Sequence, residues 1–189
     1  MGPDDPIAED DAAACRYVEA AMDSGIVAPV VGLLGGDLGR TVGARADPTR
    51  LLSADAVRLP MDLGEVILDG ERHLFVAHVL ARRSWWFGPV TAVMNAQWLG
   101  RWDVAPKSHP GDGLLDVFET DMTFDDRLKA RRRLLTGTHV PHPEIRQRRI
   151  VDGRFDLERP TPIRIDGRLV GSFKTVEVRV LADAWIAVV

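Results

Sequence analysis

Apolar positions repeat at two different spacings along the chain, and the spacing changes near residue 55. The segment Glu9–Ser24 is rich in alanine and starts with acidic residues, which predicts a helix. Ile26–Leu34 is a short apolar run with β-branched residues and predicts a buried strand, and Asp37–Val42 has the pattern of a second helix. These elements predict a small α/β unit at the N-terminus.

From Val57 onward, apolar residues mostly alternate with polar ones, which is the period of a half-buried strand. Asp-Gly pairs recur between such runs and predict tight turns, at residues 69–70, 112–113, 152–153 and 166–167. One helix is predicted at Phe124–Leu135, with an apolar side and an arginine-rich side. The predicted fold class is α+β and predominantly β: a two-layer antiparallel β-sandwich over residues 51–189 beside a small α/β unit over residues 1–50.

Composition places the chain among ordinary globular proteins, with 189 residues, 46% hydrophobic and 28% charged. The single cysteine excludes an internal disulfide and fits a reducing compartment. The first residues are acidic, unlike a signal peptide, and the longest uncharged run, Ser84–Gly100, is too short to span a bilayer. We therefore expect a cytoplasmic protein with at most peripheral association at the inner membrane face.

Charge is distributed unevenly around a net value of −4. Between Asp126 and Arg159 there are ten basic and five acidic residues, so this part is positive and the rest strongly negative. Such a run is most often a solvated face, and its sharper interpretation is a surface for phosphate or anionic headgroups. No aromatic residues are interleaved with the arginines for base stacking, so a nucleic-acid partner is not expected.

Glycines gather between the predicted strand and second helix, at Gly32, Gly35, Gly36 and Gly39. A glycine-rich turn before a helix N-terminus suits phosphate binding, but the spacing matches neither common nucleotide motif, and a plain tight turn explains it too. His139 and His142 form an H-x-x-H pair without a convincing third zinc ligand.

Six short motifs follow one another in a characteristic order. They are V-G-L-L-G-G-D-L-G-R-T-V-G (31–43), V-R-L-P-M-D-L-G-E-V (57–66), M-N-A-Q-W-L-G (94–100), A-P-K-S-H-P-G-D-G-L-L-D-V (105–117), G-T-H-V-P-H-P-E-I (137–145) and P-I-R-I-D-G-R (162–168). In this order they resemble the bacterial diacylglycerol kinases, a lipid-kinase family that shares its fold with NAD kinases and sphingosine kinases. The resemblance covers residues 30–189 and no single motif in it is specific.

The resemblance implies a two-domain kinase that uses ATP and Mg²⁺ to phosphorylate a lipid. It implies that Asp166 is the general base on the lipid hydroxyl, and that Asp112 helps to hold Mg²⁺. Asn95 and His139 match motifs on the substrate side. The nucleotide or phosphate side is matched by four residues of the glycine-rich stretch: Gly35, Gly36, Asp37 and Arg40.

The sequence also departs from the family pattern. In the family a G-G-D-G-T loop precedes the G-T-x-N-D-x-A-R motif, and residues 35–40 align best with the second of these. Only residues 1–8 then lie upstream, and they contain no such loop. Alternatively, Gly35-Gly36-Asp37 is a degenerate phosphate loop and the later motif is missing. Arg168 also replaces the acidic residue expected after Asp166-Gly167.

We therefore expect a lipid-kinase-like protein without a complete ATP-binding loop, acting as a lipid- or ligand-binding module or together with a partner subunit. An active small lipid kinase is the first alternative, and an anionic-surface module using residues 127–149 is the second. Five aromatic residues lie within 18 positions, too many for one strand face, and predict a homodimer contact, a partner contact or a lipid groove: Trp85, Trp86, Phe87, Trp98 and Trp102.

Overall fold

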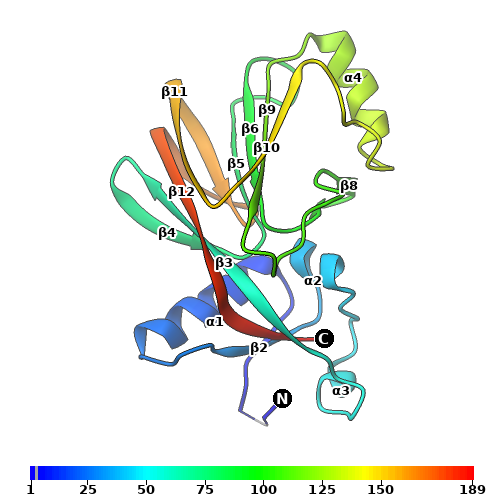
Figure 1. Ribbon diagram of the computed structural model, residues 1–189, viewed down its shortest axis with the longest axis vertical. Coiled ribbons are helices and arrows are strands. Elements are labelled where there is room, and N and C mark those ends of the chain that lie inside the picture. The colour runs from blue at the N-terminus through cyan, green and yellow to red at the C-terminus, as the bar shows by residue number, and fades with distance from the viewer. Residues whose placement is uncertain (3) are drawn as a thin grey trace.

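The structure, a computed structural model, describes residues 1–2 and 4–189. Its helices are α1 (Asp11–Asp23), α2 (Gly36–Val42), α3 (Pro48–Leu51) and α4 (Phe124–Arg133). Its strands are β1 (Ile7–Ala8), β2 (Val30–Leu33), β3 (Arg58–Leu68), β4 (Glu71–Phe75), β5 (His78–Arg82), β6 (Val90–Met94), β7 (Trp98–Leu99), β8 (Trp102–Asp103), β9 (Leu115–Thr120), β10 (Ile145–Ile150), β11 (Asp152–Ile165) and β12 (Arg168–Val188). Helices α1, α2 and α3 gather at one end of the molecule and α4 lies at the other (Figure 1).

Hydrogen bonds join ten strands into one continuous sheet in the order β1-β2-β12-β11-β5-β6-β9-β10, with β3 on β12 and β4 on β3. β7 and β8 form a separate two-stranded sheet. The predominantly β prediction is confirmed. The sheet is mixed, however, because β1 pairs with β2 and β2 with β12 in parallel. The N-terminal α/β unit thus shares its sheet with the rest of the chain, and the expected boundary at residue 50 falls within α3.

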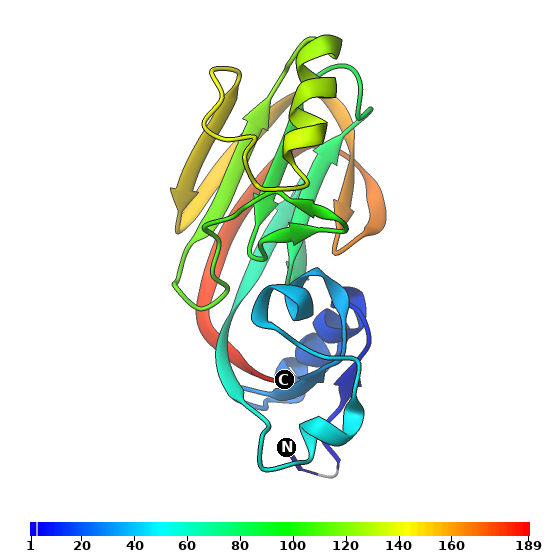
Figure 2. The same ribbon diagram turned by 90° about the vertical axis from the view of Figure 1, so that its right-hand side faces the viewer.

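Strand β12 is the longest element and connects the two ends of the molecule (Figures 1 and 2). Its first part pairs with both β3 and β11, and its last residues pair with β2. Its register with β3 shifts between Leu181 and Trp185, and Asp183 at this break has a positive φ of 50°. The break directs Trp185 into the core, where its indole N–H donates to the Asp62 carbonyl at 3.3 Å.

Two of the four predicted Asp-Gly turns close hairpins. Asp69-Gly70 joins β3 to β4 and Asp166-Gly167 joins β11 to β12, and all four residues have positive φ, as a primed turn requires. Asp112-Gly113 lies in the loop before β9. The prediction is wrong for Asp152-Gly153, which begins β11 and pairs with β12, because the chain turns one residue earlier, at Val151.

The predicted helices are confirmed with small changes in their bounds. Asp10 caps α1 by accepting from the Ala13 N–H at 2.7 Å, and Thr123 caps α4 by accepting from the Asp126 N–H. β2 is shorter than the predicted strand because the chain preceding it, at Ala28, has a positive φ. Among the described residues, no helix combines the length and apolarity needed to cross a membrane.

Three apolar clusters fill the interior. One lies between α1 and the sheet, around Val18, Leu33 and Trp185. The second lies between β3, β11 and β12 on one side and β5, β6 and β9 on the other. The third covers the opposite face of β5, β6 and β9, beneath α4 and the β7–β8 pair. Strands buried on both faces explain the nearly continuous apolar runs in this part of the sequence.

Gly64 and Phe75 give a test of packing in the second cluster. Gly64 of β3 pairs with Phe75 of β4, and a Cβ on Gly64 would overlap the fully buried Phe75 ring. We expect Gly64→Ala to lower the free energy of unfolding by about 1–3 kcal/mol, because overpacking strains a dense core. In a Phe75→Leu background, urea titration should give a smaller loss for the same substitution. An equal loss in both backgrounds would show that the ring does not set the requirement for glycine.

Candidate functional site

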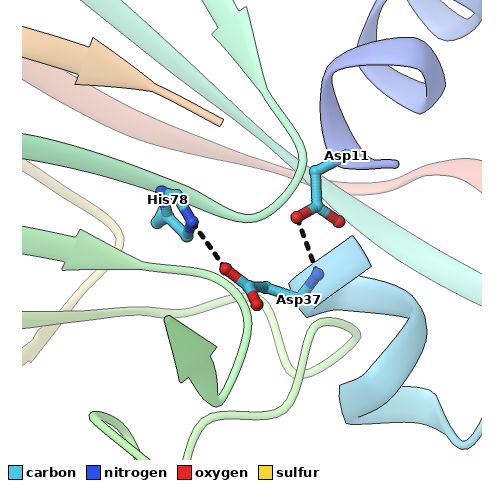
Figure 3. A group of neighbouring side chains, drawn as sticks. All are labelled: Asp11, Asp37 and His78. Carbon is cyan, nitrogen blue, oxygen red and sulfur yellow. Dashed lines mark hydrogen bonds and ion pairs between the residues drawn. The ribbon is translucent and has the colours of Figure 1, made fainter. Parts of the chain in front are cut away.

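The N-terminus of α2 is bonded to a side chain from another helix. The Asp11 carboxylate, at the first turn of α1, accepts from the Asp37 N–H at 2.7 Å (Figure 3). It also accepts from the Leu38 N–H at 3.0 Å. Asp11 is buried. Two N–H donors at a helix N-terminus are the groups that bind a phosphate in many nucleotide sites. In this chain an internal carboxylate already takes both.

Gly35 and Gly36 are needed for this close approach. Gly36 has a φ of +83°, and a Cβ there would overlap the Asp11 carboxylate. A Cβ on Gly35 would lie 2.5 Å from the Glu9 carbonyl oxygen. The glycine-rich turn therefore serves contact with the chain's own acidic segment at residues 9–11.

Asp37 connects α2 to β5 of the large sheet and to the turn between β7 and β8. One carboxylate oxygen lies 3.1 Å from Nε2 of His78, the first residue of β5 (Figure 3), and the other accepts from the Gly100 N–H at 2.8 Å. Arg40 donates to the Gly100 carbonyl at 2.9 Å and stacks on Trp98, 3.4 Å from its ring centroid. Arg40 is thus engaged with the β7–β8 pair.

Asp166 lies in the turn between β11 and β12 and is buried. Its carboxylate accepts three backbone bonds, from the N–H groups of Val76 (2.9 Å), Ala77 (2.9 Å) and His78 (3.0 Å). Its own N–H donates to the His78 carbonyl at 3.0 Å. Three donors use most of the acceptor positions of a carboxylate. The predicted base therefore holds the segment that positions His78.

Negative charge concentrates around His78. Burial lowers the pKa of His78, but its hydrogen bond to Asp37 and the charges of Asp166, Asp37 and Asp11 outweigh burial and raise it. Burial and then the charge of Asp166 raise the pKa of Asp11 to about 7, against its two N–H bonds. Burial also raises the pKa of Asp166, against His78 and the backbone donors. The cluster therefore favours bound protons near neutral pH.

Asp11, Asp37 and His78 form the group of potential metal ligands found among the described residues, with ligand atoms within 4.8 Å of one another. Two carboxylates and an imidazole suit a transition metal better than Mg²⁺, which prefers oxygen ligands alone. Each of the three side chains is also already bonded within the chain. The residues therefore do not form a ready Mg²⁺ site.

Asp112, the predicted magnesium ligand, lies elsewhere and is partly exposed. One of its oxygens pairs with Arg149 and the other accepts from the Leu114 N–H at 3.1 Å. Arg149 also lies 3.6 Å from the buried Asp116 carboxylate. A cation at Asp112 would have to displace this guanidinium, and the magnesium role of Asp112 stays a prediction.

Asn95 and His139, predicted on the substrate side, are both buried but belong to different places. Asn95 donates to the Asp62 carbonyl at 3.0 Å and to the Val76 carbonyl at 2.8 Å, so it supports the segment that binds Asp166. His139 lies against the Phe118 ring, in the wall of an apolar cavity beneath α4. Burial lowers the pKa of His139, which keeps it neutral there.

No sequence-family profile matches the chain, and no curated protein matches it by sequence. Its similarity to solved structures is clear. Two candidate diacylglycerol kinases of Bacillus anthracis str. Sterne align with TM-scores of 0.71 and 0.64, over 97% and 84% of this chain and 77% and 69% of theirs. A further diacylglycerol kinase structure from the same strain aligns with a TM-score of 0.60, over 84% of this chain and 66% of that one. Sequence identities are 13%, 13% and 14% respectively.

The chain has the fold of the diacylglycerol kinases. The resemblance predicted from the motif order is thus confirmed at the level of the fold. Within this fold the structure brings together Asp37, Asp166 and the glycines of α2, and it places Asp112 and His139 apart from them.

Sequence reasoning missed Asp11 and His78, two central members of the cluster. Asp11 has the pattern of an ordinary acidic residue in a first helical turn, and His78 stands in an apolar run. One signal was present: three consecutive acidic residues, at 9–11, precede a helix at the point where β1 ends. This is a strand–turn–helix unit with acidic residues in its turn.

The pKa of Asp11 gives a test of the cluster. Asp11 has a pKa of about 7 in the folded chain against 3.8 otherwise, so the folded state binds more protons between these values and loses stability as pH rises through them. The raised pKa of His78 acts in the same direction. Protonated His78 stabilises the folded chain at pH values below 6.5, its ordinary pKa, and this stabilisation is lost as pH rises through the pKa of the folded state. We expect Asp11→Asn to gain stability relative to the natural chain as pH rises from 5 towards 8.

Urea titrations across this pH range would measure the effect. Asp23→Asn is the matched control, because it removes one negative charge from the exposed end of the same helix. A stability difference between Asp11→Asn and the natural chain that stays constant with pH would contradict the assignment.

Proposed function

We propose that this chain is a diacylglycerol-kinase-like lipid-binding protein that takes an acyl chain into the cavity beneath α4 and does not bind ATP by itself. The observation that carries the proposal is the cavity, which has a volume of about 120 Å³ and almost purely apolar walls. Small-molecule sites are typically concave, apolar and fitted with a few polar groups at their edge.

Strands form the floor of this cavity. Leu80 of β5, Ala92 of β6 and Phe118 of β9 point into it from the same face of the sheet. Trp85 and Trp102 stand at its side in an edge-to-face pair, with ring centroids 4.9 Å apart. Aromatic and aliphatic walls of this kind favour hydrocarbon over a polar ligand.

Helix α4 forms the roof, with Ala130 and Arg127 facing inward. Arg127 is buried and donates to the Met122 carbonyl at 2.9 Å, to the Trp85 carbonyl and to the Gly88 carbonyl. These bonds tie the roof to the loop after β5. An engineered apolar cavity of about 150 Å³ holds a benzene-sized ligand, so the present volume fits a segment of an acyl chain, and a longer chain requires α4 to move outward.

The nucleotide side has the opposite character. The N–H groups of Asp37 and Leu38 are bonded to Asp11, and Glu9 and Asp10 add negative charge at the same turn. A phosphate group would have to displace the Asp11 carboxyl, which is part of the chain itself. It would also be repelled by the negative charges of Glu9 and Asp10. This supports lipid binding without autonomous ATP binding, and weighs against an active small kinase.

Cavity filling tests the lipid-binding role. A dansyl-labelled fatty acid is excited by energy transfer from Trp85 and Trp102, which line the cavity. We expect saturable binding to the natural chain, and an affinity at least about tenfold lower for Ala130→Phe, because the new ring occupies the cavity. Ala20→Phe, at an exposed position of α1, is the control and should bind as the natural chain does. Equal affinity for Ala130→Phe, or no binding by the natural chain, would reject the proposal.

A further inference from the structure

Apolar side chains are exposed around α4 and the loop before β6. Phe87 is 66% exposed, Phe124 46%, Leu135 43% and Leu128 39%. We call these four residues the aromatic surface. It lies at the end of the molecule opposite α1, α2 and α3 (Figures 1 and 2).

Contacts between rings hold this surface in one shape. The Phe87 ring stacks on Phe124 with centroids 5.9 Å apart and planes 20° apart, and Trp86 packs against Phe124 at 5.5 Å. Phe124 and Leu128 are one helical turn apart on the same side of α4. Arg127, bonded to the loop carbonyls, fixes the loop to the helix. The side chains of Phe87, Phe124 and Leu128 thus form one contiguous platform, and Leu135 follows the C-terminus of α4.

Basic side chains border the platform. Arg83 lies in the loop of Phe87, and Arg131 and Arg132 follow Leu128 by three and four residues on the same side of α4, whereas Arg133 lies on the side opposite Phe124. None of these four forms an ion pair with a carboxylate in the part of the chain that the structure describes. The acidic residues of this region are largely compensated: Asp126 pairs with Lys129 at 3.0 Å and Asp121 with Arg127 at 3.5 Å, which leaves Asp125.

We propose that the aromatic surface docks on an anionic lipid bilayer, with Phe87, Phe124 and Leu128 in the interfacial region and Arg83 and Arg132 on lipid headgroups. Interfacial helices combine an apolar side with basic residues in this way, and aromatic rings favour the headgroup level. Basic residues near an anionic leaflet add electrostatic attraction to this apolar contact.

The aromatic surface is continuous with the mouth of the cavity beneath α4, which supports a lipid bilayer as its partner. Trp86 and Arg131 line the cavity and also contact the platform: Arg131 lies over Trp86 at 4.9 Å and Trp86 packs on Phe124. A bilayer at this surface would offer acyl chains directly to the cavity, so the inference rests on the proposed function in this respect. A second copy of the chain fits less well, because a two-fold contact here would bring both sets of arginines together.

Vesicle co-sedimentation tests the docking. We expect the natural chain to bind vesicles of phosphatidylcholine with phosphatidylglycerol, to bind phosphatidylcholine alone weakly, and to be released by high salt. Phe87→Ser/Phe124→Ser and, separately, Arg83→Glu/Arg132→Glu should each lower vesicle affinity at least about tenfold. Val27→Ser removes a 91% exposed apolar residue between α1 and β2 and should leave binding unchanged.

Fatty-acid binding without vesicles separates this inference from the proposed function. Phe87 and Phe124 do not line the cavity, so Phe87→Ser/Phe124→Ser should retain the affinity of the natural chain for the dansyl-labelled fatty acid. Vesicle binding without fatty-acid binding would reject the cavity and keep the docking surface. Vesicle affinity unchanged by both double substitutions would overturn the docking surface. A second result would also overturn it. In that result, sedimentation velocity shows a concentration-dependent dimer that Phe87→Ser/Phe124→Ser dissociates, and neither the natural chain nor the variant binds anionic vesicles.

Discussion

The Asp166 carboxylate is the interaction on which the arrangement of the site depends. A buried carboxylate without donors carries a large desolvation cost, and here three N–H groups of residues 76–78 offset it. The bonds fasten the β11–β12 turn to the connection between β4 and β5. That connection begins β5 with His78, whose imidazole then reaches Asp37 and brings α2 against the sheet. Removing the carboxylate would therefore free three donors and loosen α2 together with them.

Once α2 is placed, the N–H groups at its N-terminus need an acceptor, and the Asp11 carboxyl supplies one from within the chain. The N–H groups at the N-terminus of α2 thereby become part of an internal contact. The cavity beneath α4 does not depend on this contact, since it is built from β5, β6, β9 and the β7–β8 pair. The proposed lipid site and the internally bonded N-terminus of α2 thus share no residues.

Local features of this fold could be predicted from the sequence, and contacts distant in sequence could not. The Asp-Gly turns at 69 and 166 and the caps of α1 and α4 depend on neighbouring residues only. Motif order predicted Asp37 and Asp166 as site residues, because a motif keeps its pattern whatever it contacts, and the structure joins both to His78. Their roles stay predictions. Asp11 and His78 gain their roles from partners 26 and 41 positions away, and neither carries a local pattern. The parallel pairing of β2 with β12 was missed for the same reason.

The backbone amides of Asp37 and Leu38 report most directly on the central claim, that α2 is closed to phosphate by Asp11. Their resonances can be followed by NMR during a titration of the full chain with Mg-ATP. The account predicts that neither amide shifts in a saturable way at millimolar nucleotide, while both shift in Asp11→Asn, where the carboxylate charge is gone. Saturable shifts of both amides in the natural chain at micromolar Mg-ATP would contradict it.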